Sequence, residues 1–222
     1  MVDDHYYVRA TEFFHDATHY DKTDRSGPKI FVGEWATREG APTPNFGAAL
    51  GDAAWMTGLE RNSDVVVMAA YAPLLVNVNP GGMQWETDLI GYDALRSYGS
   101  PSYYAQVMFS SYLGDETLAS KLEGGGPKLF YSVTEDTKRK RLYLKLVNAA
   151  SAPQSVAVKF AGASLANTGK LVMLKAAGTQ ATNTLENPAH LVPVESRLRN
   201  IGSDLEYTVP AYSIQVIQID HR

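Results

Sequence analysis

The sequence has no cysteine among its 222 residues, which excludes disulfide bonds and thiolate metal sites. It also lacks any apolar run of about 18 residues, the length that a membrane-spanning helix needs, so we expect no membrane partner. The basic residues are scattered, with 20 Lys and Arg against 24 Asp and Glu and a net charge of -4. A nucleic-acid partner is therefore not expected either. The 45% hydrophobic and 20% charged content is that of a globular protein.

Several short motifs are missing as well. The first residues, Met1 to His5, lack the basic and apolar regions of a signal peptide, and the sequence leaves the localisation open. His15 and His19 lie four apart, but no Glu follows the first His as it does in zinc hydrolases. Gly124 to Gly126 lacks the Lys and Ser or Thr of a phosphate-binding loop. We therefore predict no metal and no cofactor.

The two halves of the chain follow different hydrophobic patterns, with the change near Gly114. In residues 1–113, apolar runs at 29–33 and 65–70 flank a segment at 46–62 whose apolar residues recur at helical spacing. This alternation predicts an α/β fold with a parallel sheet covered on both faces, either doubly wound or part of a (β/α)8 barrel. Because a whole barrel takes about 250 residues, this half has room for roughly three β/α units.

Two further helices are expected in the first half, at 11–20 and at 101–113, where proline suits the first turn of the second one. The segment from Tyr71 to Trp85 follows the last apolar run and is rich in Gly and Pro. We interpret it as a long loop without secondary structure, which is typical of a functional loop. Trp85 could line a sugar subsite there, although ordinary turn chemistry is the alternative.

The second half, residues 114–222, has the alternating pattern of β-strands. Strands are expected at 142–147, 156–160, 171–174 and 212–219, separated by turn-rich segments. The last of these changes phase between Val216 and Ile217, which indicates either a bulge or a strand that serves two faces. A β-sandwich domain of about 100 residues fits this pattern.

Glu34 is the leading candidate for chemistry, because it follows the apolar run at 29–33. In an α/β barrel, the active site is built where strands end at the C-terminal face. Trp35 beside it could offer a flat apolar surface to a sugar ring. His5 and Tyr7 stand at the end of another expected strand and could hold a nucleophilic carboxylate by hydrogen bonds. The alternatives are a rim carboxylate in an ion pair and a half-buried aromatic cluster.

Motifs along nearly the whole chain, taken together in their order and spacing, resemble the C-terminal portion of glycoside hydrolase family 51 α-L-arabinofuranosidases. They are Asp4-His5-Tyr6-Tyr7, Gly27 to Ala36, Ala48 to Asp64, Ala70 to Leu74, Trp85 to Ile90, Tyr98 to Tyr104, Asn187-Pro188 and Val209 to Ser213.

The resemblance implies a (β/α)8 catalytic barrel, of which residues 1–113 are the C-terminal part, followed by a jelly-roll-like β-sandwich at 114–222. It implies a retaining enzyme that releases terminal α-L-arabinofuranosyl groups from plant polysaccharides. Glu34 corresponds to the nucleophile, and His5, Tyr7 and Trp85 correspond to residues of the sugar pocket. Trp35 stands where the family commonly has Tyr.

Double displacement needs a second carboxyl group about 5 Å from the nucleophile. In the family, that group belongs to an Asn-Glu segment upstream of Asp4, and this sequence has no Asn-Glu pair. We therefore expect the chain to be a fragment whose partners are the N-terminal part of the barrel and an arabinose-containing oligosaccharide or polysaccharide. An incomplete barrel could also associate into a homo-oligomer.

Two other interpretations remain open on the sequence. The chain could be a non-catalytic carbohydrate-binding or structural module in which only the β-sandwich matters. It could also belong to a related retaining glycosidase with a different sugar preference, which would share all of these motifs.

Overall fold

The chain alternates strands and helices in its first part and consists of antiparallel strands in its second. The computed structural model describes residues 1–162 and 164–222. The helices are α1 (Ala10–Asp16), α2 (Phe46–Arg61) and α3 (Pro101–Ser111). The strands are β1 (Val2–Val8), β2 (Ile30–Thr37), β3 (Val66–Tyr71), β4 (Leu75–Asn77), β5 (Ile90–Tyr92), β6 (Ser97–Gly99), β7 (Glu116–Thr117), β8 (Leu129–Asp136), β9 (Arg141–Asn148), β10 (Gln154–Lys159), β11 (Leu165–Lys175), β12 (Val194–Arg199), β13 (Asp204–Val209) and β14 (Ser213–His221).

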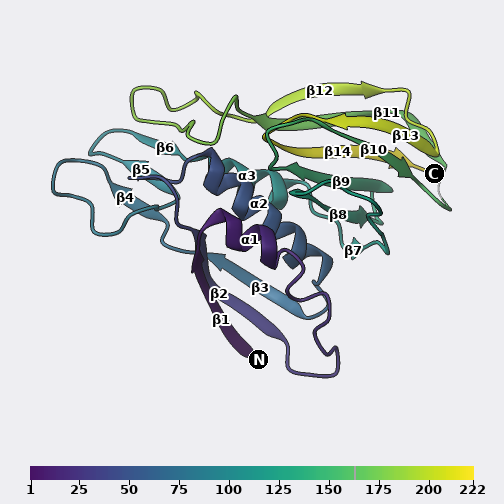
Figure 1. The fold of residues 1–222 in the computed structure, drawn as a ribbon, viewed down its shortest axis with the longest axis horizontal. Helices are drawn as coiled ribbons and strands as arrows, with labels where there is room; N and C mark the ends of the chain where they lie inside the picture. Colours follow the sequence, from purple (N-terminus) through teal and green to yellow (C-terminus); the bar gives the residue numbers. More distant parts are fainter. Residues whose placement is uncertain (163) are drawn as a thin grey trace.

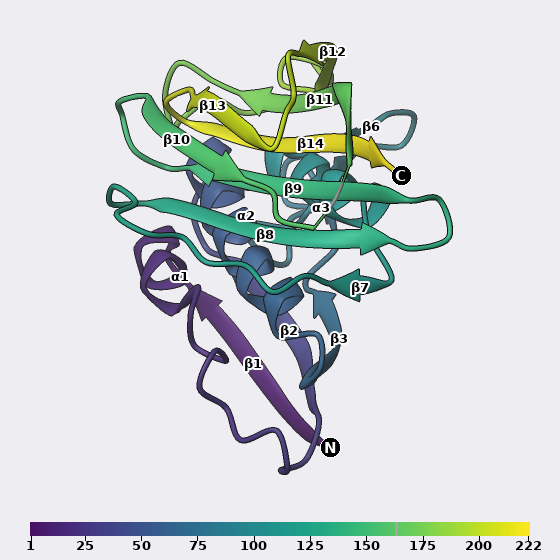
Figure 2. The ribbon, with the colours of Figure 1, turned by 90° about the vertical axis from the view of Figure 1, so that its right-hand side faces the viewer.

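The elements form layers, with the helices between two sheets (Figure 1). On one side lies a parallel sheet of order β1-β2-β3, in which α1 and α2 are the connections. On the other side lies an antiparallel sheet of order β12-β11-β14-β9-β8-β7, against which the β10-β13 pair packs to form the predicted β-sandwich. Figure 2 shows β8 and β9 running across the helices. A small sheet, β4-β5-β6, stands beside the helices.

Helix α2 is the centre of the molecule. Asn45 caps its N-terminus, because the side chain accepts a hydrogen bond from the backbone N–H of Ala48 at 3.0 Å. Every residue from Phe46 to Glu60 is buried, since the parallel sheet covers one side of the helix and the β-sandwich covers the other. The helix predicted at 46–62 is therefore confirmed, and it is covered all around.

One hydrophobic core runs through both halves of the chain. It joins Trp35 and Trp55 of the first half to Val147 and Ile214 of the β-sandwich. The two halves therefore pack against each other through a continuous apolar interface and are not separate domains on a flexible linker.

A buried ion pair crosses this interface. The Lys145 ammonium of β9 contacts the Glu60 carboxylate of α2, which also accepts a hydrogen bond from the hydroxyl of Ser132. The ammonium lies 5.0 Å from the centroid of the Phe109 ring. Burial lowers the pKa of Lys145, and the attraction of Glu60 opposes that effect.

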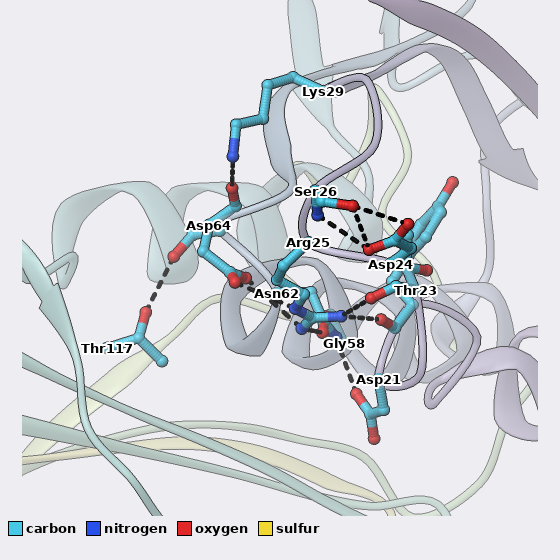
Figure 3. A network of polar contacts seen from close by, with 12 residues as sticks. Asp21, Thr23, Asp24, Arg25, Ser26, Lys29, Gly58, Asn62, Asp64 and Thr117 are labelled. Carbon is cyan, nitrogen blue, oxygen red and sulfur yellow. Dashed lines mark hydrogen bonds and ion pairs between the residues drawn. The ribbon is translucent and has the colours of Figure 1, made fainter.

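The end of the parallel sheet where the strands begin is fastened by Arg25, as Figure 3 shows. Its guanidinium donates to Asp64 at 3.0 Å and to the side-chain oxygen of Asn62 at 2.6 Å. It also donates to the carbonyl of Tyr20 at 2.9 Å. These bonds connect the segment before β2 to the turn between α2 and β3, which leaves the opposite end of the sheet for the candidate site.

The structure corrects three sequence predictions. The parallel strands are not covered on both faces, because Val67, Met68 and Ala69 of β3 are exposed. The helix predicted at 11–20 is shorter, since α1 ends at Asp16. The segment 71–85 is not free of secondary structure, because it contains β4, which pairs with β5.

The phase change in the last strand is explained by its position. β14 pairs with β9 in continuous register from Ser213 to Asp220, and its residues are buried on both faces as far as Ile217. It is a central strand that serves two faces. The helices predicted at 46–62 and 101–113 and the strands at 29–33 and 65–70 are all present.

Within the described residues, the three parallel strands form an open sheet that does not close into a barrel. None of the described helices is long and apolar enough to cross a membrane.

Candidate functional site

Glu34 lies within β2, three residues before the strand ends at Thr37, and not after the strand as its sequence position suggested. The pairing of β2 with β3 shifts register between Val32 and Trp35, and the pairing with β1 shifts between Asp4 and His5. Such irregularities re-aim side chains. Here the side chain of Glu34 is 47% exposed on the open side of the sheet.

Strand β1 brings two of the predicted site residues to Glu34. Tyr7 donates a hydrogen bond from its hydroxyl to Oε2 of Glu34 at 2.6 Å. Nδ1 of His5 lies 3.7 Å from the same oxygen, and its Nε2 lies 3.2 Å from Oδ2 of Asp3. Asp3, His5 and Tyr7 lie on the same face of β1 because side chains alternate along a strand. The predicted grouping of His5, Tyr7 and Glu34 is thus present in the structure.

The two oxygens of Glu34 have different surroundings. Tyr7 occupies Oε2, whereas Oε1 has no hydrogen-bond partner among residues 1–162 and 164–222. Burial raises the pKa of Tyr7 to about 12, and the hydrogen bond to Glu34 adds to the effect. The tyrosine therefore stays protonated at neutral pH and keeps donating to Oε2.

The glycine before Glu34 lies close to side chains of β1. A Cβ on Gly33 would lie 2.2 Å from Oδ1 of Asp3 and 3.2 Å from Nε2 of His5. Any larger residue would displace the Asp3 carboxylate and with it the His5 ring. The Gly-Glu order thus allows β1 side chains to lie across β2.

A cavity of about 350 Å³ opens beside Glu34. Trp85 lies at its rim with 60% of its surface exposed. The lining residues are Tyr7, Glu34, Arg38, Ala72, Pro73, Trp85, Glu86 and Thr87. A cavity of this size, with an aromatic side chain and a carboxylate in its wall, has the dimensions and the chemistry of a small-sugar site.

Trp35 lies elsewhere, and the prediction that it contacts a sugar is corrected. The residue is 2% exposed and packs between Phe13 and Tyr71, at ring-centroid distances of 6.0 and 5.2 Å. Its side chain points into the helical layer, away from the face that carries Glu34. Trp35 is therefore part of the core that supports the site.

Sequence reasoning missed Arg38 and Glu86, which both line the cavity. Arg38 directly follows the end of β2, and Glu86 directly follows Trp85. Their positions after a strand end and in the loop beside Trp85 were the available signals, since strand ends and their loops form the rim of such a site.

A buried carboxylate beneath the site holds the end of β2. Asp52 of α2 accepts a hydrogen bond from the backbone N–H of Thr37 at 2.9 Å. Burial raises the pKa of Asp52 to about 7, against the lowering effect of the nearby Ser102 and Thr37 hydroxyls. Thr37 is three residues from Glu34, so α2 fixes the course of the strand that carries the candidate nucleophile.

Comparisons with known proteins identify the family of the chain. The family model described as the alpha-L-arabinofuranosidase C-terminal domain matches residues 17–213. The chain is 35% identical over 216 residues to alpha-L-arabinofuranosidase 2 of Arabidopsis thaliana, covering 95% of this chain and 32% of that protein. It is 36% identical over 219 residues to probable alpha-L-arabinofuranosidase A of Aspergillus terreus, covering 97% of this chain and 33% of that protein.

Among solved structures, the arabinose-bound MgGH51 α-L-arabinofuranosidase aligns with a TM-score of 0.91 and 35% identity. The alignment covers 99% of this chain and 37% of that one. The chain belongs to the glycoside hydrolase family 51 α-L-arabinofuranosidases and corresponds to their C-terminal portion. It spans about one third of the length of the curated relatives that it matches.

Proposed function

We propose that this chain is part of a retaining glycoside hydrolase that releases terminal α-L-arabinofuranosyl groups from plant polysaccharides. The observation that carries the proposal is the hydrogen bond between Tyr7 and Glu34 at the wall of an open cavity. A carboxylate held by a neutral donor on one oxygen, with its other oxygen free, is arranged to act as a nucleophile.

We further propose that β1, β2 and β3 with their helices are the last three units of a (β/α)8 barrel, within residues 1–113. Residues 114–222 would form the accompanying β-sandwich domain. The support is the change from parallel strands to antiparallel strands after α3 and the exposed apolar residues Val67 and Met68, 47% and 48% accessible, on β3. Because β3 is the edge strand of this sheet, these exposed apolar side chains indicate a surface that further barrel strands cover.

We propose the following roles for these groups in double displacement. Oε1 of Glu34 attacks the anomeric carbon, and the bond from that carbon to the leaving-group oxygen breaks. A second carboxyl group gives its proton to that oxygen, and it later takes a proton from the water that cleaves the glycosyl ester. We place this second carboxyl group in the N-terminal part of the barrel, outside these 222 residues.

Tyr7 and His5 act as positioning residues. The Tyr7 hydroxyl fixes the rotation of the Glu34 carboxylate and leaves Oε1 without a hydrogen-bond partner among the described residues. The His5 ring, between Asp3 and Glu34, lies near the same oxygen, Oε2, and further restricts the carboxylate. Trp85 offers its exposed face to the sugar or to the residue next to it.

The test joins this chain to the N-terminal two thirds of the Aspergillus terreus relative and measures hydrolysis of 4-nitrophenyl α-L-arabinofuranoside. Glu34→Gln keeps the shape of the side chain but removes the nucleophilic charge, so kcat should fall by roughly 10³-fold or more. Glu86→Gln is the matched control, because it removes the same charge from the same cavity. It should keep kcat within about tenfold.

Equal losses in both variants would assign the effect to cavity charge, and full activity of Glu34→Gln would reject Glu34 as nucleophile. Mass spectrometry of the protein after incubation with a slow 2-fluoro-arabinofuranosyl substrate gives a second readout. The covalent adduct should appear on the peptide that contains Glu34.

A further inference from the structure

Arg38 carries a charge that the proposed reaction does not use. The residue directly follows β2, is exposed and lines the cavity beside Glu34. Its guanidinium lies 5.7 Å from the centroid of the Tyr7 ring, in the geometry of a cation–π contact. In the part of the chain that the structure describes, no carboxylate lies within ion-pair distance of this guanidinium.

The position of the charge argues against a role in bond breaking. The transition state of glycoside hydrolysis carries positive charge on the sugar ring, and a nearby cation does not stabilise it. The contact with Tyr7 keeps the guanidinium near the Tyr7–Glu34 pair all the same. An arginine in such a place is suited to bind an anionic group of the ligand.

The chemistry of that group follows from the guanidinium. Its planar fork of N–H donors matches a carboxylate, with which it forms two parallel charge-assisted hydrogen bonds. Sugar hydroxyl groups are neutral and are bound equally well by uncharged side chains. Because Arg38 is exposed at the rim, its partner belongs to the sugar next to the one inside the cavity.

We propose that Arg38 is a specificity-determining residue that binds the carboxylate of a uronic acid next to the arabinofuranosyl group. The inference rests on the proposed function, because it takes the cavity to hold the arabinosyl group. It extends that function by naming acidic, uronate-bearing glycans as the preferred substrate class.

The experiment compares two ligands that differ in one group. The first is an arabinofuranosyl-substituted oligosaccharide that carries a glucuronic acid, and the second is the same molecule after reduction of the carboxyl group to an alcohol. Binding of each to the 222-residue chain is measured by titration calorimetry. We expect the acidic ligand to bind about tenfold more tightly, as one charge-assisted pair predicts. This preference should shrink as salt is raised.

Arg38→Gln should remove the preference, so that the acidic and the reduced ligand bind this variant with equal affinity. Arg38→Lys should keep part of the preference, because it retains the charge but not the bidentate geometry. Lys138→Gln, which removes a positive charge from the turn between β8 and β9, is the matched control and should bind like the wild type.

The outcomes separate the two proposals. Equal affinity of the wild-type chain for both ligands, or a preference that survives in Arg38→Gln, overturns the role of Arg38 and leaves the sugar cavity intact. Failure of the wild-type chain to bind either ligand overturns the sugar cavity itself, and the role of Arg38 with it.

Discussion

Two glutamates on neighbouring elements show how differently this fold treats the same side chain. Glu34 on β2 is half exposed, lines a cavity and accepts a hydrogen bond from Tyr7 on one oxygen. Glu60 on α2 is buried and bound by Lys145 and Ser132. The first has a free oxygen for a substrate, and the second has contacts on both oxygens.

The difference arises from what covers each element. The open face of the parallel sheet leaves polar groups of β1 and β2 accessible, whereas α2 is enclosed between that sheet and the β-sandwich. A partly satisfied carboxylate survives only where water or a ligand reaches it. Substitutions near Glu34 should therefore change chemistry, and substitutions near Glu60 should change stability.

The largest effect on stability is expected for Lys145→Met. This change leaves the Glu60 carboxylate buried without its cation, and breaking such a pair costs about 3–5 kcal/mol of unfolding free energy. Urea unfolding of the 222-residue chain measures it. Lys138→Met, on an exposed turn, is the control and should stay within about 0.5 kcal/mol.

The double variant Lys145→Met with Glu60→Leu sharpens this test. Replacing both charges by apolar groups should restore much of the lost stability, because no charge is then left unpaired. If Lys145→Met alone is as stable as the wild type, the conclusion that the Glu60–Lys145 pair is enclosed and needed for stability is wrong.

The next largest effect is a pH dependence that originates at Asp52. Its pKa is raised to about 7 in the fold, whereas an ordinary aspartate has a pKa of about 4. The stabilisation that protonated Asp52 contributes to the unfolding free energy is fully present below about pH 4. Between about pH 4 and 7 the unfolded chain loses its proton first, so the unfolding free energy falls by up to about 4 kcal/mol, with no further change above pH 7.

Asp52→Asn keeps the acceptor for the Thr37 N–H but cannot titrate. The difference in unfolding free energy between the wild type and this variant should therefore follow pH from 4 to 7. Parallel stability curves for the two proteins over that range would show that Asp52 does not titrate there.

The smallest effect on stability is expected for Gly33→Ala, which tests the surroundings of the half-exposed Glu34 against those of the buried Glu60. The new Cβ would meet the Asp3 carboxylate and move the His5 ring. Since this clash involves an exposed side-chain end, the unfolding free energy should change by less than about 1 kcal/mol. In the joined protein, kcat should fall roughly tenfold, because the orienting groups of Glu34 are misplaced.

Gly178→Ala is the matched control, since a Cβ there meets nothing within 4 Å. In an Asp3→Ala background, Gly33→Ala should cause little further loss. A large loss of stability in Gly33→Ala, with kcat unchanged, would contradict the division between chemistry and stability.

Much of the fold was predictable because its signals are local. Helical spacing and the cap at Asn45 define α2, and apolar runs define β2 and β3. The short β4–β6 sheet was missed because three-residue strands leave almost no periodic signal. The prediction that the parallel sheet is covered on both faces was wrong, because an apolar run does not show whether another element packs against each face.

The candidate site was predictable in part. His5, Tyr7, Glu34 and Trp85 were named from strand ends and from family motifs, and the structure brings His5 and Tyr7 to Glu34. Trp35 was misplaced because neighbouring side chains of a strand point to opposite faces, so that Trp35 packs against Phe13 and Tyr71 while Glu34 lies on the other face. Their roles in catalysis remain predictions that the variants above test.

The sequence by itself determined the three helices, the division into parallel and antiparallel regions, and the motifs that identify the family. Only the tertiary structure decided which side of β2 is open, that Trp35 supports the core, and that Arg38 lies over Tyr7. The physical reason is that periodicity fixes local conformation. The direction of a side chain at an irregular strand, and whether its charge finds a partner, depend on the elements that pack around it.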